Sequence, residues 1–195
     1  TANVLAMLEP WPELSRRTLT KLSSFEVVEA RRRSPRTQGE HGFFLVGCRD
    51  WVNVVPFTDA GKVVLVRQYR HGSDSFTLEL PGGAIDPGEG YLEAARRELR
   101  EESGYAAREL VLLGDVNPNP SIMMNRCGTV LARGCQRVGD LDQDPGEDLE
   151  VVELTTAELR TAIRAGETDH ALVLAALVYL ELHDGPETIF ERTAP

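Results

Sequence analysis

Short apolar runs separated by turn-forming residues recur along most of the chain. They predict strands over residues 25–31, 42–48, 51–57, 62–68, 77–80, 110–116, 128–132 and 149–154. Residues 63–66 are apolar at every position, which is typical of a central strand buried on both faces. Residues 1–24 show little periodicity, so we expect a loosely structured N-terminal segment there.

A loop followed by a helix is predicted in the middle of the chain. Residues 86–88 (Asp-Pro-Gly) are strong turn formers. Leu92, Ala95 and Leu99 are spaced to lie on one face of a helix, and Gly104 stands where a glycine commonly ends one. The segment between the turn and Gly104 is therefore expected to be largely helical.

Two further helices are predicted after the last strand. Thr155 and Glu158 form a capping box for a helix that ends near Gly166. Asp169 is expected to open the next helix, over residues 171–183. Its apolar residues are too many for one face, so it is expected to be deeply buried or to form an oligomer contact. Runs of strands with a few interspersed helices indicate a mixed α+β fold.

The charge of the chain limits the classes of partner. Its 31 acidic and 21 basic residues give a formal net charge of −10. Proteins that bind nucleic acid through the phosphate backbone carry a basic surface instead. The run Arg31-Arg32-Arg33 is therefore interpreted as a solvated strand end. We expect no nucleic-acid partner, whereas a small phosphorylated substrate held through metal ions is compatible with this charge.

Membrane association and disulfide bonds are not expected. The longest apolar run, residues 171–180, is shorter than the roughly 20 residues that cross a bilayer. Cys48, Cys127 and Cys135 lack metal-type spacing and are interpreted as packing residues in a reducing compartment. No N-terminal segment has the pattern of a signal peptide. These features predict a soluble cytoplasmic protein.

Three glutamates of the central helix share one face. Glu98, Glu101 and Glu102 stand at i, i+3 and i+4, so their carboxylates repel one another. A hard divalent cation such as Mg²⁺ would remove this repulsion, because it prefers carboxylate oxygen. Arg97, one turn before Glu101, can orient one carboxylate. The alternative is a solvated acidic helix face, as charge runs usually are.

The spacing of the whole segment distinguishes these alternatives. The stretch resembles the Nudix box, G-x5-E-x7-R-E-U-x-E-E-x-G-U, where U is apolar. The positions that match are Gly83, Glu89, Arg97, Glu98, Leu99, Glu101, Glu102 and Gly104. Tyr105 stands where an aliphatic residue is commoner. The approach to the box, residues 64–70 and 78–83, is similar to that of ADP-ribose pyrophosphatases and related nucleoside-diphosphate-sugar hydrolases.

The resemblance implies an α/β/α sandwich with a mixed sheet. It divides the chain into an N-terminal β extension, residues 1–50, expected to form the contact of a homodimer, and a Nudix hydrolase domain, residues 51–195. It also implies a Mg²⁺ (or Mn²⁺) cofactor. The implied metal ligands are Glu98, Glu102, Glu101 and the backbone carbonyl of Gly82. Arg97 is counted among the catalytic residues. Its expected role, like that of Glu89, is to position the other side chains of the site.

Substrate contacts are expected on the strands before the box. Arg70 would contact the diphosphate, because a guanidinium matches phosphate oxygens bidentately. Arg67 is a weaker candidate of the same kind. Glu79 would support the site or touch substrate. The alternative for Arg70 is a surface arginine that pairs with an acid. The alternative for Glu79 is an ordinary glutamate on a strand surface.

Hydrolysis also needs a general base. In related enzymes this is often a glutamate on a mobile loop before the last strand, here residues 139–148. Glu147 is the first choice, with Asp144 or Glu101 as alternatives, and a solvated acidic loop is the competing interpretation.

The predicted reaction is metal-dependent hydrolysis of a nucleoside diphosphate sugar, with ADP-ribose giving AMP and ribose 5-phosphate. Two alternatives remain. One is a hydrolase for another nucleotide sugar such as GDP-mannose. The other is a nucleotide-binding module that keeps the fold without catalysis, against which the intact set of acids argues. An RNA-end hydrolase is disfavoured by the net charge.

Overall fold

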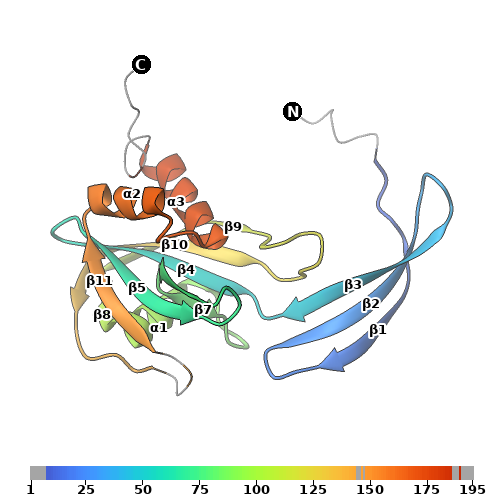
Figure 1. Cartoon of the computed structure of the whole chain (residues 1–195), viewed down its shortest axis with the longest axis horizontal. Coiled ribbons are helices and arrows are strands. Elements are labelled where there is room, and N and C mark those ends of the chain that lie inside the picture. Colours follow the sequence, from blue (N-terminus) through green and yellow to red (C-terminus); the bar gives the residue numbers. More distant parts are fainter. Residues whose placement is uncertain (1–7, 144–145, 147, 186–188, 190–195) are drawn as a thin grey trace. The chain divides into compact units, whose positions relative to one another are not determined.

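The structure is a computed structural model that describes residues 8–143, 146, 148–185 and 189 (Figure 1). The chain forms two compact units. Residues 1–49 and 117–125 make up the first unit, and residues 50–116 and 126–195 make up the second. None of the helices in these described ranges is long and apolar enough to cross a membrane.

The first unit contains a three-stranded antiparallel sheet. Its strands are β1 (Glu13–Lys21), β2 (Phe25–Arg33) and β3 (Glu40–Cys48), in that order. The two predicted strands within β2 and β3 are confirmed, but the expectation of a loosely structured N-terminal segment is wrong for β1. All nine residues of β1 are exposed, so the strand has no buried face to mark it in the sequence, and backbone pairing with β2 defines it.

The second unit is built on an eight-stranded mixed sheet. Its strands follow the order β11-β5-β4-β10-β8, while β6, β7 and β9 pair with β5, β4 and β10. Their bounds are β4 (Trp51–Thr58), β5 (Val63–Arg70), β6 (Ser75–Glu79), β7 (Gly82–Ala84), β8 (Tyr105–Ala106), β9 (Glu109–Val116), β10 (Cys127–Arg137) and β11 (Leu149–Leu154). Strands β4 and β10 are parallel. Residues 63–66 of β5 are fully buried, as their apolar run predicts.

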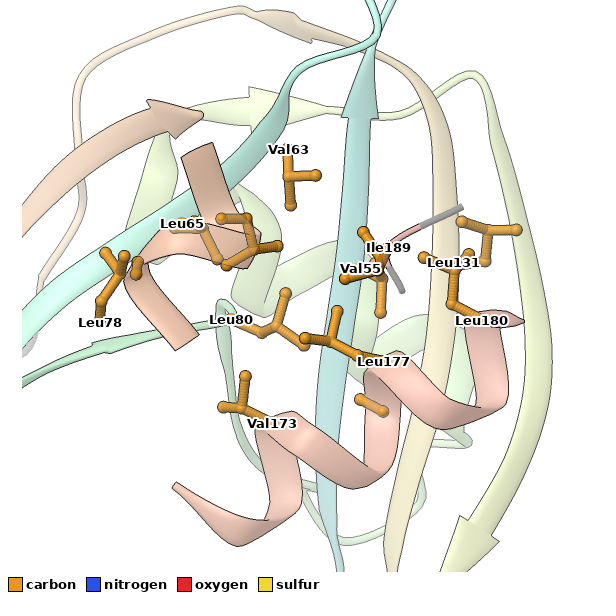
Figure 2. Packing of buried hydrophobic residues seen from close by; sticks show 13 residues of the cluster. Val55, Val63, Leu65, Leu78, Leu80, Leu131, Val173, Leu177, Leu180 and Ile189 are labelled. Carbon is orange, nitrogen blue, oxygen red and sulfur yellow. The ribbon is translucent and has the colours of Figure 1, made fainter. Parts of the chain in front are cut away.

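Helices cover both faces of this sheet (Figure 1). Helix α1 (Tyr91–Ser103) packs on one face, in a core cluster made of Val52, Val54, Val64, Ala94, Ala95, Leu99, Tyr105, Val130, Ala132 and Cys135. Helices α2 (Thr156–Ala165) and α3 (Ala171–Asp184) share a second cluster with other sheet residues, including Val55, Leu65 and Leu131 (Figure 2). Burial of two separate apolar layers gives the α/β/α sandwich that was expected.

The helix ends follow the sequence signals closely. Gly104 ends α1 with a φ of 73°, a left-handed conformation that glycine adopts without strain. Thr155 and Glu158 form the capping box of α2. Helix α3 is capped by His170, not by Asp169 as predicted. One side of α3 is buried in the core, but Val178 and Leu182 are 50% and 78% exposed.

Candidate active site

Helix α1 turns its carboxylates toward the short strand β7. Glu98 and Glu102 are buried, with 8% and 5% of their surface exposed. They lie one helical turn apart on the same face, because residues at i and i+4 are neighbours. Burial of two carboxylates is costly unless hydrogen bonds or cations compensate for it.

Arg97 is the cation at the centre of this group. Its guanidinium bonds Glu89 with Nε–Oε1 3.0 Å and Nη2–Oε2 2.9 Å, and Nη1 donates to Glu98 at 2.8 Å and Glu101 at 3.1 Å. Nη2 also donates to the carbonyl oxygen of Ala84 at 3.0 Å. Bonding to Glu89, opposed by burial and reinforced by Glu98 and Glu101, raises the pKa of Arg97. One positive charge therefore forms hydrogen bonds with three carboxylates, and the carboxylate of Asp86 lies 3.9 Å from Nε.

The glycines of β7 allow this strand to approach the carboxylates. The backbone N–H of Gly82 donates to Glu102 Oε2 at 2.7 Å. A Cβ on Gly83 would lie 2.4 Å from Glu98 Oε1, and a Cβ on Gly82 would lie 2.1 Å from the carbonyl oxygen of Val52. A side chain at position 82 would therefore meet the backbone of β4, and one at position 83 would displace the carboxylate of Glu98. The backbone of β7 lies against two of the predicted metal ligands.

The donor chemistry of this group fits a hard divalent cation. All side-chain donors are carboxylate oxygens, which Mg²⁺ prefers, and their negative charge exceeds that of the nearby guanidinium. Within the described ranges, no three acidic, His or Cys side chains are already gathered in metal-binding geometry. Arg97 bonds Glu98 and Glu101 instead, so those two carboxylates would have to turn toward a cation. Glu98, Glu101, Glu102 and the backbone of Gly82 are the groups that would hold it.

A cavity of about 1030 Å³ opens beside these residues. The residues that line it include Gly82, Gly83, Glu102, Arg70 and Glu79. The size suits a nucleotide-sized ligand, because ligand cavities commonly enclose about 300–1,000 Å³. The carboxylates of α1 thus border a space that can hold a substrate.

Arg70 and Glu79 form a rigid pair on the cavity wall. Two parallel hydrogen bonds join them, Nε–Oε1 at 2.7 Å and Nη2–Oε2 at 2.8 Å, and the Thr77 hydroxyl also donates to Glu79. Burial favours the neutral acid, but these hydrogen bonds outweigh it, so the pKa of Glu79 lies below its ordinary value. The Arg70 side chain is 45% exposed, whereas that of Glu79 is 4% exposed. The buried carboxylate holds a guanidinium that remains accessible from the cavity.

Among the described residues, four predicted site residues lie outside the cavity lining. Three of them are on α1, namely Arg97 and the two glutamates to which it donates hydrogen bonds, Glu98 and Glu101. Arg67 lies away from this group, with its guanidinium carbon 5.5 Å from the centroid of the Phe76 ring. Glu147, the predicted general base, and its alternative Asp144 lie outside the described residues.

Several cavity residues were not predicted from the sequence, namely Trp51, Asn53, Gln68, Asp148, Asp169 and His170. Asn53 did carry a signal, since it is a polar residue within the apolar strand β4. Asp169 was expected to open a helix, without a role in the site. His170 accepts a hydrogen bond from Leu172 N through Nδ1 and caps α3. Its position on the wall depends on the packing of α3, which local sequence does not specify.

Comparison with known proteins agrees with this geometry. The family model described as NUDIX domain matches residues 49–177, well over half of the chain. The chain therefore belongs to the Nudix family, and it is a pyrophosphohydrolase enzyme. Nudix hydrolases generally use divalent metal ions, in agreement with the donor set on α1.

Individual relatives point to ADP-containing compounds. The chain is 33% identical over 129 residues to ADP compounds hydrolase NudE of Escherichia coli (strain K12), which covers 66% of this chain and 68% of that protein. It is 30% identical over 136 residues to the ADP-ribose pyrophosphatase of Bacillus subtilis (strain 168), covering 68% and 72%. A crystal structure of an ADP compounds hydrolase superposes with a TM-score of 0.80 at 26% identity, covering 90% of this chain and 95% of that one.

Proposed function

We propose that the protein hydrolyses the diphosphate bond of ADP-ribose in a Mg²⁺-dependent reaction and releases AMP and ribose 5-phosphate. The observation that carries the proposal is the pair of buried carboxylates, Glu98 and Glu102, held against the glycines of β7 at the edge of the cavity. Relatives named for ADP-ribose and for ADP compounds support the choice of substrate.

The roles of the residues follow from their chemistry. Glu98, Glu101 and Glu102 would hold the cation, and the Gly82 carbonyl would be a further ligand. When bound, the cation neutralises phosphate charge and lowers the pKa of water. Arg70 binds a non-bridging phosphate oxygen, and Glu79 keeps the guanidinium in place. Water attacks one phosphorus, the bond from that phosphorus to the bridging oxygen breaks, and a carboxylate accepts the proton of the water.

The proton acceptor is assigned to Glu147. This assignment comes from its place in the acidic loop before β11, since the residue lies outside the described ranges. Glu147→Gln is expected to lower kcat about 100-fold or more and to leave KM within a few-fold, because removal of a general base affects the transition state alone. Steady-state kinetics measures both parameters. A kcat close to that of the wild type would place the base elsewhere, with Asp144 and Glu101 as the next candidates.

A broader specificity for ADP compounds is the second candidate function. It is favoured by the similarity to ADP compounds hydrolases in both sequence and structure. A screen of Mg²⁺-dependent hydrolysis over ADP-ribose, ADP-glucose, GDP-mannose, NADH and diadenosine polyphosphates distinguishes the candidates through the mononucleotide released. Strong preference for ADP-ribose supports the first proposal, and comparable turnover of several ADP compounds supports the second. Preference for GDP-mannose contradicts both, and no turnover favours a binding module.

We further propose that residues 1–50 form the contact of a homodimer. Three large apolar residues on the strands of the first unit have at least 40% of their surface exposed, namely Leu14, Leu19 and Phe44. Exposed apolar residues of this kind, gathered in one small sheet, are common at protein interfaces. Light scattering coupled to size exclusion is expected to give twice the mass of the chain, and Phe44→Glu is expected to shift the protein toward a monomer. A monomeric wild type would contradict the proposal.

A further inference from the structure

Strand β4 carries one amide side chain into the wall of the cavity. Asn53 lies between Val52 and Val54, which are both fully buried. Its Nδ2 atom is buried and has no hydrogen-bond partner. In the described part of the chain, Asn53 is the cavity-lining residue with such an atom. A buried donor without an acceptor costs free energy, and a ligand that fills the cavity would supply the missing acceptor.

The position of Asn53 indicates what that acceptor is. Asn53 is paired with Gly82 in the register of β4 and β7, and a Cβ on Gly82 would lie 3.1 Å from Asn53 Oδ1. The N–H of the same glycine bonds Glu102 at 2.7 Å. The amide therefore lies beside the backbone that anchors a proposed metal ligand. Arg70 lines the same cavity and supplies a second hydrogen-bond donor to it.

We propose that Asn53 is a substrate-binding residue whose Nδ2 donates a hydrogen bond to a non-bridging oxygen of the substrate's diphosphate. The inference rests on the proposed diphosphate hydrolysis and adds a contact to it. A diphosphate presents several acceptor oxygens, and the phosphate beside the metal site is the one within reach of the β4–β7 pair. Asn53 supplies a neutral donor there, which binds the phosphate oxygen without competing with the cation for the carboxylates.

Replacement of Asn53 by valine tests the contact. Valine suits an apolar strand and removes the donor, so the melting temperature of the free protein is expected to stay unchanged or to rise. Binding of the non-hydrolysable α,β-methylene analogue of ADP-ribose in the presence of Mg²⁺ is expected to weaken about tenfold. A merely structural asparagine would instead lose stability on replacement. Isothermal titration calorimetry and thermal melting measure the two effects.

Two further variants sharpen the test. Asn53→Asp keeps the shape but replaces the donor with an anionic acceptor, so analogue binding is expected to weaken more than in Asn53→Val. Thr129→Val is the matched control, because Thr129 is the register partner of Asn53 on β10, is 3% exposed and does not line the cavity. It makes a similar change from polar to apolar on the neighbouring strand, and binding is expected to match that of the wild type.

Each outcome decides the proposal. If Asn53→Val binds the analogue within twofold of the wild type, an ordered water satisfies the amide and the proposal is wrong. If the Mg²⁺ affinity of Asn53→Val, measured in the absence of nucleotide, also falls about tenfold, Oδ1 of Asn53 is a metal ligand. The assignment as a substrate-binding residue is then also wrong. If the wild type itself does not bind the analogue, the ADP-ribose proposal fails. The same comparison with Mg²⁺ and inorganic imidodiphosphate then still decides whether Asn53 contacts a diphosphate.

Discussion

Two runs of like charge differ sharply in how the fold compensates them. The arginines at the end of β2 meet glutamates of neighbouring strands. Arg32 lies 2.8 Å from Glu13 and Arg33 lies 3.0 Å from Glu40. These pairs arise from cross-strand register, and their side chains remain about one-third to one-half exposed. The arginine run is thus paired within its own sheet, as expected of a solvated strand end.

The glutamates of α1 are not each paired with a basic residue of a neighbouring strand. Arg97 bonds Glu89, Glu98 and Glu101 at once, and Glu102 accepts from a backbone N–H. Two of these acids are buried, so water screens them poorly. The two runs therefore differ in burial, and we interpret the buried acidic run as a site and the exposed arginine run as a solvated strand end. The following variants test this distinction from both sides.

The largest effect is expected at Glu102. Glu102→Gln keeps the size of the side chain but removes a charge that would bind the cation, so turnover is expected to fall about 100-fold or more with the fold intact. Mg²⁺ titration of activity and circular dichroism measure the two properties. Glu109→Gln, at an exposed glutamate of β9, is the control and should change neither. A nearly unchanged rate for Glu102→Gln would contradict the metal-site assignment.

A smaller effect on turnover, joined to a loss of stability, is expected at Arg97. Arg97→Gln leaves Glu89, Glu98 and Glu101 without their shared cation, which is expected to lower the free energy of unfolding by about 2 kcal/mol and the turnover about tenfold. Mg²⁺ should restore part of the stability, because a cation compensates the same repulsion. Denaturant unfolding with and without Mg²⁺ measures this. A stability loss that is identical in both conditions would show that the carboxylates do not bind the metal.

The sequence predicts most of the second unit because its signals are local. Helical spacing alone places Glu98 and Glu102 on one face, and the apolar run of β5 predicts a central strand. The part of the Nudix box from Arg97 to Glu102 follows helix periodicity, whereas Gly83 lies on β7 and Glu89 precedes α1. By contrast, the pairing of Asn53 with Gly82 joins segments about thirty residues apart, and no local pattern specifies that register.

Strand geometry also separates the two candidate arginines. Residues three apart on a strand point to opposite faces, so Arg67 and Arg70 cannot share one site through β5 alone. The structure pairs Arg70 with Glu79 on the cavity wall and places Arg67 over Phe76. Strand β1 escaped prediction for a different reason, since none of its residues is buried. Because β1 does not pack against a core, its apolar and polar residues do not alternate in the way that predicts a strand.

The next smaller effect is expected at Glu79. Its pKa is lowered in the folded state, so its contribution to stability is present above the ordinary value of 4.5 and is lost as the pH falls through the folded value. Glu79→Gln is expected to lower the free energy of unfolding by about 1–2 kcal/mol at pH 7, and by progressively less below pH 4.5. Unfolding at several pH values measures the difference. Glu150→Gln, at an exposed glutamate of β11, is the control. A loss that grows on acidification would contradict the assignment.

The smallest effect is expected in the arginine run. Arg33→Gln removes an exposed ion pair with Glu40, and such pairs contribute less than about 1 kcal/mol. Unfolding free energy should stay close to that of Arg36→Gln, in the turn between β2 and β3, and turnover should not change. Binding to a single-stranded oligonucleotide, measured by fluorescence anisotropy, should be undetectable in both variants and in the wild type. Oligonucleotide binding that weakens in Arg33→Gln alone would mean that the run is a site despite its pairing.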